Sequence, residues 1–222
     1  MLSMLLNGNG EGSTFELNFA DMSNDIQQII NHSLTKATDY STYREQVAEL
    51  VTQGKNTGPE QTEALAEYTK LNDRRMKRLD KTLKISEADE NELKAQANRR
   101  TFLVLTESWC GDAAQTMPVI NKVADLNPNF EMKVVLRDEN LDLMDAFLSN
   151  GARAIPKMIV LDEDQNVIGE WGSRPSTATK MVEDYKAAHG GLSPEFKQEL
   201  QLWYNKDKGQ TTVTDLKSLI VG

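Results

Sequence analysis

The sequence predicts an α/β fold in which a mixed four-stranded sheet follows a long helical region. Three observations predict it. Apolar residues recur at helical spacing through the first hundred residues, and four short apolar runs then alternate with helices in the order βαβαββα. Gly190-Gly191 separates this part from a C-terminal helical tail. The expected division is a flexible tail (1–21), a helical region (22–99), an α/β domain (100–190) and a helical tail (191–222).

The helical region is expected to contain four helices. A capping box at Thr42 and Glu45 starts the second. The third is expected to run from Pro59 to Leu83, since proline suits the first helical turn. Ser86 can cap a fourth that ends near Asn98. The first helix shows the apolar spacing i, i+3, i+4, i+8 at Ile26, Ile29, Ile30 and Leu34.

The α/β part begins where the spacing of apolar residues changes. Residues 101–105 form a continuous apolar run, typical of a strand that is buried on both faces. Right-handed crossovers are expected to join the first three strands, and a turn at 162–166 makes the fourth antiparallel. The other expected strands are 132–136, 158–161 and 167–171. The expected helices are one around 117–124, then 141–148, 176–188, 194–204 and 215–220.

Charge and composition exclude several classes of function. A net charge of −9 and a pI near 4.9 argue against a general binder of nucleic acid or anionic membranes. The single cysteine excludes an intramolecular disulfide, and the two histidines, His32 and His189, lack ligand spacing, so we expect neither metal nor cofactor. No apolar run is long enough for a membrane span or a signal peptide. The expected location is the cytoplasm, where the cysteine stays reduced.

Residues 70–84 carry a concentration of positive charge. They hold seven Lys or Arg against two Asp, a net of +5, so the rest of the chain sums to −14. One interpretation is a solvated helix face that pairs with acidic neighbours. The other is a contact surface for an anionic partner, with nucleic acid disfavoured by the remaining negative charge. The helical region as a whole is a candidate for binding a protein partner.

Cys110 is the candidate functional residue, because it lies where the first strand ends and a helix begins. Sites in α/β proteins form at this end of a strand. Free N–H groups and the dipole of a helix N-terminus favour thiolate over thiol, whereas Asp112 two residues later disfavours a second negative charge. A small buried apolar role is the alternative for a lone cysteine.

Residues 101–176 resemble the thioredoxin fold. The resemblance rests on Trp109-Cys110-Gly111, on Pro118 eight residues after the cysteine, on Arg153-Ala154-Ile155-Pro156, which looks like the cis-proline loop, and on Gly172 at the end of the last strand. It implies that the Pro156 loop faces Cys110 and that the backbone of Ile155 binds an extended substrate. The implied site residues are Cys110 as the nucleophile and Trp109, Gly111, Asp112, Ala113, Ile155 and Pro156 as substrate-binding residues.

Two departures from the thioredoxin pattern change the expected chemistry. Ala113 stands where the family carries its second, resolving cysteine, and Val104 stands where it carries a buried acid. Dithiol reductase activity is therefore not expected. Monothiol exchange with a protein or low-molecular-weight disulfide is the leading hypothesis. The alternatives are a non-catalytic binding or adaptor module and a peroxide sensor. Lys157 either places a cation near Cys110 or is simply solvated.

Overall fold

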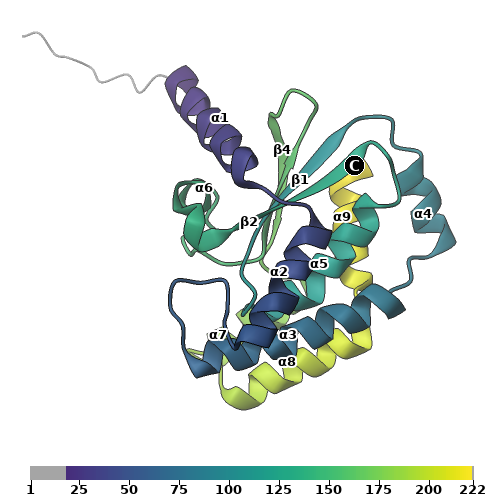
Figure 1. Cartoon of the computed structure of the whole chain (residues 1–222). Coiled ribbons are helices and arrows are strands. Elements are labelled where there is room, and N and C mark those ends of the chain that lie inside the picture. The colour runs from purple at the N-terminus through teal and green to yellow at the C-terminus, as the bar shows by residue number, and fades with distance from the viewer. Residues whose placement is uncertain (1–18, 222) are drawn as a thin grey trace, which may run out of the picture.

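The computed structural model describes residues 19–221, and these form a mixed four-stranded sheet surrounded by helices (Figure 1). The predicted α/β, thioredoxin-like fold class is confirmed. The strands are β1 Arg100–Thr106, β2 Phe130–Leu136, β3 Lys157–Leu161 and β4 Val167–Gly172. The helices are α1 Phe19–Lys36, α2 Tyr40–Gln53, α3 Glu63–Thr82, α4 Glu87–Lys94, α5 Gly111–Ala124, the short 3-10 helix η1 Arg137–Glu139, α6 Leu141–Ala146, α7 Ser176–His189, α8 Pro194–Asp207 and α9 Gln210–Val221.

The sheet has the strand order β2-β1-β3-β4. β1 pairs in parallel with β2 through the crossover that contains α5, while β3 runs antiparallel to β1 and β4 antiparallel to β3. The expected crossover therefore holds for the first two strands and is wrong for the third. The segment between β2 and β3 brings the chain back to the carboxyl end of β1, so β3 starts beside the place where β1 stops.

Three expected helix starts are wrong, each because another residue supplies the cap. Asp39 accepts a hydrogen bond from the backbone N–H of Thr42 at 2.7 Å, so α2 begins before the expected capping box. Thr62 caps α3, and Pro59 lies in the preceding loop. Asp207 accepts from the N–H of Thr211 at 3.2 Å, which lets α9 start well before residue 215.

The start of α4 is as expected, since Ser86 accepts from the N–H of Asp89, but the helix ends at Lys94. At the N-terminus, α1 begins at Phe19, inside the segment expected to be a tail. The rest of that tail, residues 1–18, lies outside the described residues.

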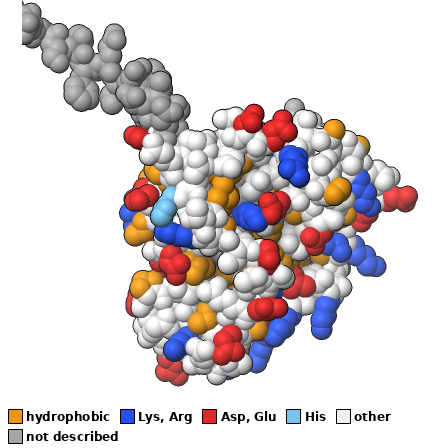
Figure 2. Space-filling view, turned by 45° about the horizontal axis from the view of Figure 1, so that its top comes forward, with side chains coloured by type: hydrophobic (Ala, Val, Ile, Leu, Met, Phe, Trp, Pro, Cys, Tyr) orange, Lys and Arg blue, Asp and Glu red, His pale blue; other side chains and the backbone are white. Residues whose placement is uncertain are grey.

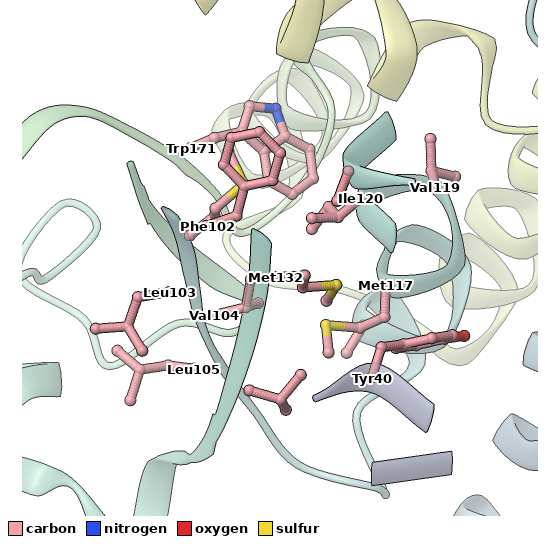
Figure 3. Packing of buried hydrophobic residues seen from close by; sticks show 14 of the residues in the cluster. Tyr40, Phe102, Leu103, Val104, Leu105, Met117, Val119, Ile120, Met132 and Trp171 are labelled. Atoms are coloured by element: carbon pink, nitrogen blue, oxygen red, sulfur yellow. The ribbon is translucent and has the colours of Figure 1, made fainter. Parts of the chain in front are cut away.

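One hydrophobic core joins the helical region to the sheet. Ile30, Tyr43 and Leu93 of the helical region belong to the same buried cluster as the residues of β1. Figure 3 shows Leu103 on one side of β1 and Phe102 on the other, facing α5. This arrangement explains the continuous apolar run, because helices cover both faces of the sheet.

A second, smaller cluster lies between α7 and α8. It consists of Ala178, Val182, Phe196, Leu200 and Tyr204 and is separate from the main core. These two helices therefore pack against each other through a hydrophobic contact of their own.

Acidic side chains are scattered over the face of the molecule drawn in Figure 2, whereas Lys and Arg gather mostly toward its right and lower right margin. Among the helices within residues 19–221, none combines the length and the apolar character that crossing a membrane requires.

Candidate functional site

Cys110 is the N-cap residue of α5. Its Sγ accepts a hydrogen bond from the backbone N–H of Ala113 at 3.4 Å. On the other side, the thiol donates to the carbonyl oxygen of Ile155 at 3.3 Å, and the Ile155–Pro156 peptide bond is cis. The pairing of β1 with β3 brings these segments together, because Leu105 near the end of β1 lies opposite Lys157 at the start of β3.

The thiol is buried. Cys110 is 8% exposed, and the pKa of its thiol is raised to about 12, mainly by burial. The negative charge of Asp112 contributes to this rise in pKa, while the backbone N–H groups of Ala113 and Asp112 and the charge of Arg174 oppose it. The desolvation cost of a buried thiolate exceeds the gain from the helix N-terminus, so Cys110 is a protonated thiol at neutral pH in this arrangement.

Asp112 is held by two residues from distant elements. The guanidinium of Arg174 contacts one carboxylate oxygen at 2.7 Å, and the hydroxyl of Tyr204 donates to the other at 3.0 Å. Burial raises the pKa of Asp112, and Arg174 opposes this shift. We call Asp112, Arg174 and Tyr204 the clasp.

The clasp attaches α8 to the N-terminal end of α5. A second bond reinforces it, as Gln115 Nε2 of α5 donates to Gln201 Oε1 of α8 at 3.0 Å. The side chains of Arg75 and Gln201 lie within 3.4 and 3.7 Å of the position that a Cβ would take on Gly111. Gly111 is therefore flanked by a polar side chain from α3, Arg75, and by one from α8, Gln201.

Removing the hydroxyl of Tyr204 should loosen the clasp. We expect Tyr204→Phe to raise the rate at which N-ethylmaleimide alkylates Cys110 roughly tenfold, because a hydrogen bond to a charged group contributes about 1.5–3 kcal/mol. Tyr185→Phe is the matched control, since that hydroxyl bonds to Ser193 within the α7–α8 cluster and not to α5. Equal rates in the two variants would show that the clasp does not limit access to the thiol.

The loop before Cys110 is tied to the helical region by buried hydrogen bonds. Asn72 of α3 donates to the carbonyl of Ser108 at 2.9 Å, and the N–H of Ser108 donates to Thr57 Oγ1 at 2.9 Å. Glu107, with no exposed surface, accepts from the hydroxyl of Thr57 and, at 3.0 Å, from the N–H of Asp138. Burial raises the pKa of Glu107. The helical region thus helps to fix where β1 ends and α5 begins.

Trp109 is half-buried. The guanidinium of Arg137 lies 4.9 Å from the centroid of its ring, a cation–π distance. The indole Nε1 is 3.2 Å from the position that a Cβ would take on Gly58, so a side chain at residue 58 would meet the ring. Trp109 flanks the cysteine as expected but is covered in part by the helical region.

The structure brings several of the sequence-predicted residues together. Cys110, Ala113 and Ile155 come together directly by hydrogen bonds, and Pro118 lies buried inside α5. The solvated interpretation of Lys157 is wrong, because its side chain is buried and its ammonium group pairs with Glu170 on β4 at 2.6 Å.

The sequence did not reveal that Arg174 and Tyr204 contact Asp112. The hydrogen bond of Tyr204 to Asp112 joins positions 92 apart, and Arg174 is the cation that acts on the cysteine. No local spacing signals either contact. Among the described residues, no cluster of three or more His, Cys, Asp or Glu side chains could hold a metal ion.

Comparisons with known proteins agree with this architecture. A family model described as Thioredoxin matches residues 58–186, more than half of the chain. A solved structure of a protein of unknown function from Pseudomonas aeruginosa is 22% identical with a TM-score of 0.54, and the match covers 82% of this chain and 97% of that one. An HIV epitope-scaffold is 20% identical with a TM-score of 0.51, covering 82% and 98%. No curated protein matches this sequence.

The two solved structures show a shared fold that extends beyond the α/β part into the helical segments. The family match includes the whole segment from the cysteine loop through the cis-proline loop to Gly172. The chain belongs to the thioredoxin family.

Proposed function

We propose that the protein carries out monothiol exchange at Cys110 with a mixed disulfide on a protein or a small thiol. The observation that carries this proposal is the position of Cys110, which caps α5 and faces the carbonyl of Ile155 at the cis-proline loop. Ala113 leaves the chain without a second thiol near this point. The chemistry that remains is the first half of a thioredoxin reaction, completed by a thiol from outside.

The proposed reaction has two balanced steps. The Cys110 thiolate attacks the capping sulfur of a substrate disulfide, a new disulfide forms between Cys110 and the cap, and the substrate leaves as a thiolate that takes up a proton. A small thiol such as glutathione then attacks this new disulfide. It restores the Cys110 thiol and leaves with the cap as a second disulfide. The external thiols supply both electrons, which suits a reducing compartment such as the cytoplasm.

Activation requires that the thiol lose its proton. Burial is the main cause of the raised pKa, and the N–H groups of Ala113 and Asp112 act in the opposite direction. A substrate that displaces the clasp would let water approach Cys110 while these N–H groups stay in place. The pKa of the thiol should then fall, and attack would be coupled to substrate binding.

The test is to incubate the protein with a glutathionylated peptide and follow adducts by mass spectrometry. We expect a glutathionyl adduct on Cys110 and its removal when free glutathione is added. Cys110→Ser should form no adduct. If Cys110 forms no adduct, the catalytic proposal fails.

Restoring the second thiol tests the alignment with dithiol thioredoxins. We expect Ala113→Cys to introduce measurable reduction of insulin disulfides, because the backbone N–H of residue 113 already lies 3.4 Å from Cys110 Sγ. Ala113→Ser is the matched control, since it has a similar size and no thiol. Absence of reduction in a folded Ala113→Cys variant would count against the proposed correspondence.

A non-catalytic binding module is the second candidate, and the burial of the Cys110 thiol favours it. A pulldown that compares the wild type with Cys110→Ala separates the two. Partners that the alanine variant keeps favour a binding module, and partners that it loses favour covalent exchange. A peroxide sensor has less support, because peroxide oxidises the thiolate and the raised pKa of Cys110 opposes its formation.

A further inference from the structure

One face of α3 is exposed, partly apolar and positively charged. Tyr68 is 54% exposed and Leu71 is 41% exposed, and Arg74 and Arg78 follow at helical spacing on the same face. The opposite face of α3 is buried, so the apolar side chains are not needed for packing. Beside them lies a hollow of about 470 Å³, lined by Ala64, Glu67, Tyr68, Lys70, Leu71 and Arg74. We call Tyr68, Leu71, Arg74, Arg75 and Arg78 the α3 face.

Among the described residues, the arginines of this face, Arg74, Arg75 and Arg78, form no ion pair, and Arg75 feels the charge of a nearby carboxylate, that of Asp112. Lys70 and Lys77 on the same helix, in contrast, pair with Glu67 and Asp73. Arg75 donates to the neutral amide of Asn72, and Arg78 to the neutral amide of Gln115. The interpretation of this segment as a face that pairs with acidic neighbours therefore does not apply to its three arginines.

Arg75 of the α3 face lies beside the residue that follows Cys110. Arg75 Nη1 lies 3.4 Å from the position of a Cβ on Gly111, the residue after Cys110. In Figure 1, α3 runs along the same end of the molecule as α8, and both helices border one further pocket. A partner that lies along α3 would thus lie close to Gly111 and to α8.

We propose that the α3 face docks an acidic polypeptide segment with an apolar anchor, and that this segment belongs to the disulfide substrate. The proposal rests on the proposed exchange reaction and names its substrate class. The arginines supply charge complementarity, and Tyr68 and Leu71 supply the apolar contact. Charges beyond about 8 Å are screened at physiological salt, so the local arginines outweigh the net charge of −9 for a short segment.

A protein segment fits this face better than a nucleic acid does. The residues outside 70–84 sum to −14, which repels a long polyanion. An exposed leucine contributes to a polypeptide contact but offers neither a phosphate donor nor a stacking surface.

Binding is tested first, on the full chain with Cys110→Ala, so that no exchange occurs. The probes are a labelled peptide rich in Asp and Glu with one central Phe, a Lys-rich peptide of the same length, and a single-stranded oligonucleotide. By fluorescence anisotropy we expect the acidic peptide to bind at least tenfold more tightly than either other probe, and to weaken as salt rises. Equal binding of the two peptides, or tighter binding of the oligonucleotide, would overturn the proposal.

Charge reversal locates the surface. Arg74→Glu should weaken binding of the acidic peptide roughly tenfold, and no hydrogen bond or ion pair of the Arg74 side chain is lost among the described residues. Arg99→Glu is the matched control, because Arg99 is exposed and precedes β1 at the end of the strand opposite to Cys110. An equal loss in both variants would show a general charge effect and reject the α3 face.

The reaction is tested separately with glutathionylated forms of the two peptides and the wild-type chain. Faster transfer of glutathione to Cys110 from the acidic peptide supports the docking proposal. Equal transfer from both peptides rejects docking and leaves monothiol exchange intact. No transfer from either, together with tight binding of the acidic peptide, rejects exchange and with it the assignment of this segment to a substrate.

Discussion

In the folded protein at pH 7, Cys110 is expected to react with iodoacetamide at least a thousandfold more slowly than free cysteine. A thiol whose pKa is about 12 is about 10⁻⁵ ionised at this pH, against a few per cent for an ordinary cysteine. Because the thiolate is the nucleophile, the rate should rise about tenfold for each pH unit between pH 7 and 10, with no plateau. The measurement is the second-order rate constant by mass spectrometry as a function of pH.

The unfolded chain provides the control for this prediction. In concentrated guanidinium chloride the same cysteine loses its burial and its contact with Ile155, so its rate should level off near the pKa of an ordinary thiol, about 8.5. A plateau below pH 9 in the folded protein would mean that the thiol is solvated, and the burial of Cys110 would then be wrong.

Replacing Gly172 with alanine is expected to destabilise the protein by about 2–5 kcal/mol, through steric overlap and backbone strain. Gly172 ends β4 with φ of +122°, a region that side chains rarely allow. A Cβ there would lie 2.2 Å from the carbonyl oxygen of Pro156. The added methyl group therefore disturbs the cis-proline loop as well as the strand. The loss of stability is measured as the change in the free energy of unfolding in urea.

Gly191→Ala is the matched control for the Gly172 prediction. Gly191 has an ordinary φ, and nothing lies within 4 Å of its Cβ position, so its replacement should change the free energy of unfolding by less than about 1 kcal/mol. If Gly172→Ala were equally mild, the loop of Pro156 would have to be able to shift away from β4.

The sheet was predictable because its signals are local. The run from Phe102 to Leu105 is apolar without interruption, and only a strand covered on both faces needs that pattern. The direction of β3 was not predictable from periodicity, since apolar spacing reads the same in parallel and antiparallel strands. Predicted helix starts were wrong where a residue outside the expected motif, such as Asp39, is the N-cap.

The candidate nucleophile, Cys110, could likewise be inferred from local sequence, but its environment could not. Trp109-Cys110-Gly111 and the Pro156 loop are short motifs that can be recognised from the identity of their residues alone. Whether the thiol ionises depends on its burial and on the charges of Asp112 and Arg174, which meet only in the folded chain. From sequence alone, the opposing effects of the helix N-terminus and the Asp112 charge on the pKa of Cys110 could not be ranked. Burial in the folded chain decides in favour of the protonated thiol.

The sequence by itself determined the family, the position of Cys110 and the loss of its partner at Ala113, because each depends on residue identity at one place. Tertiary structure alone decided how far the thiol of Cys110 is exposed to solvent and how readily it ionises. The burial of its thiol and the charges that act on it come from residues far apart in the chain, such as Ile155 and Arg174. Burial disfavours the charged form of the thiol, and burial is a property of the whole fold that a local sequence pattern does not predict.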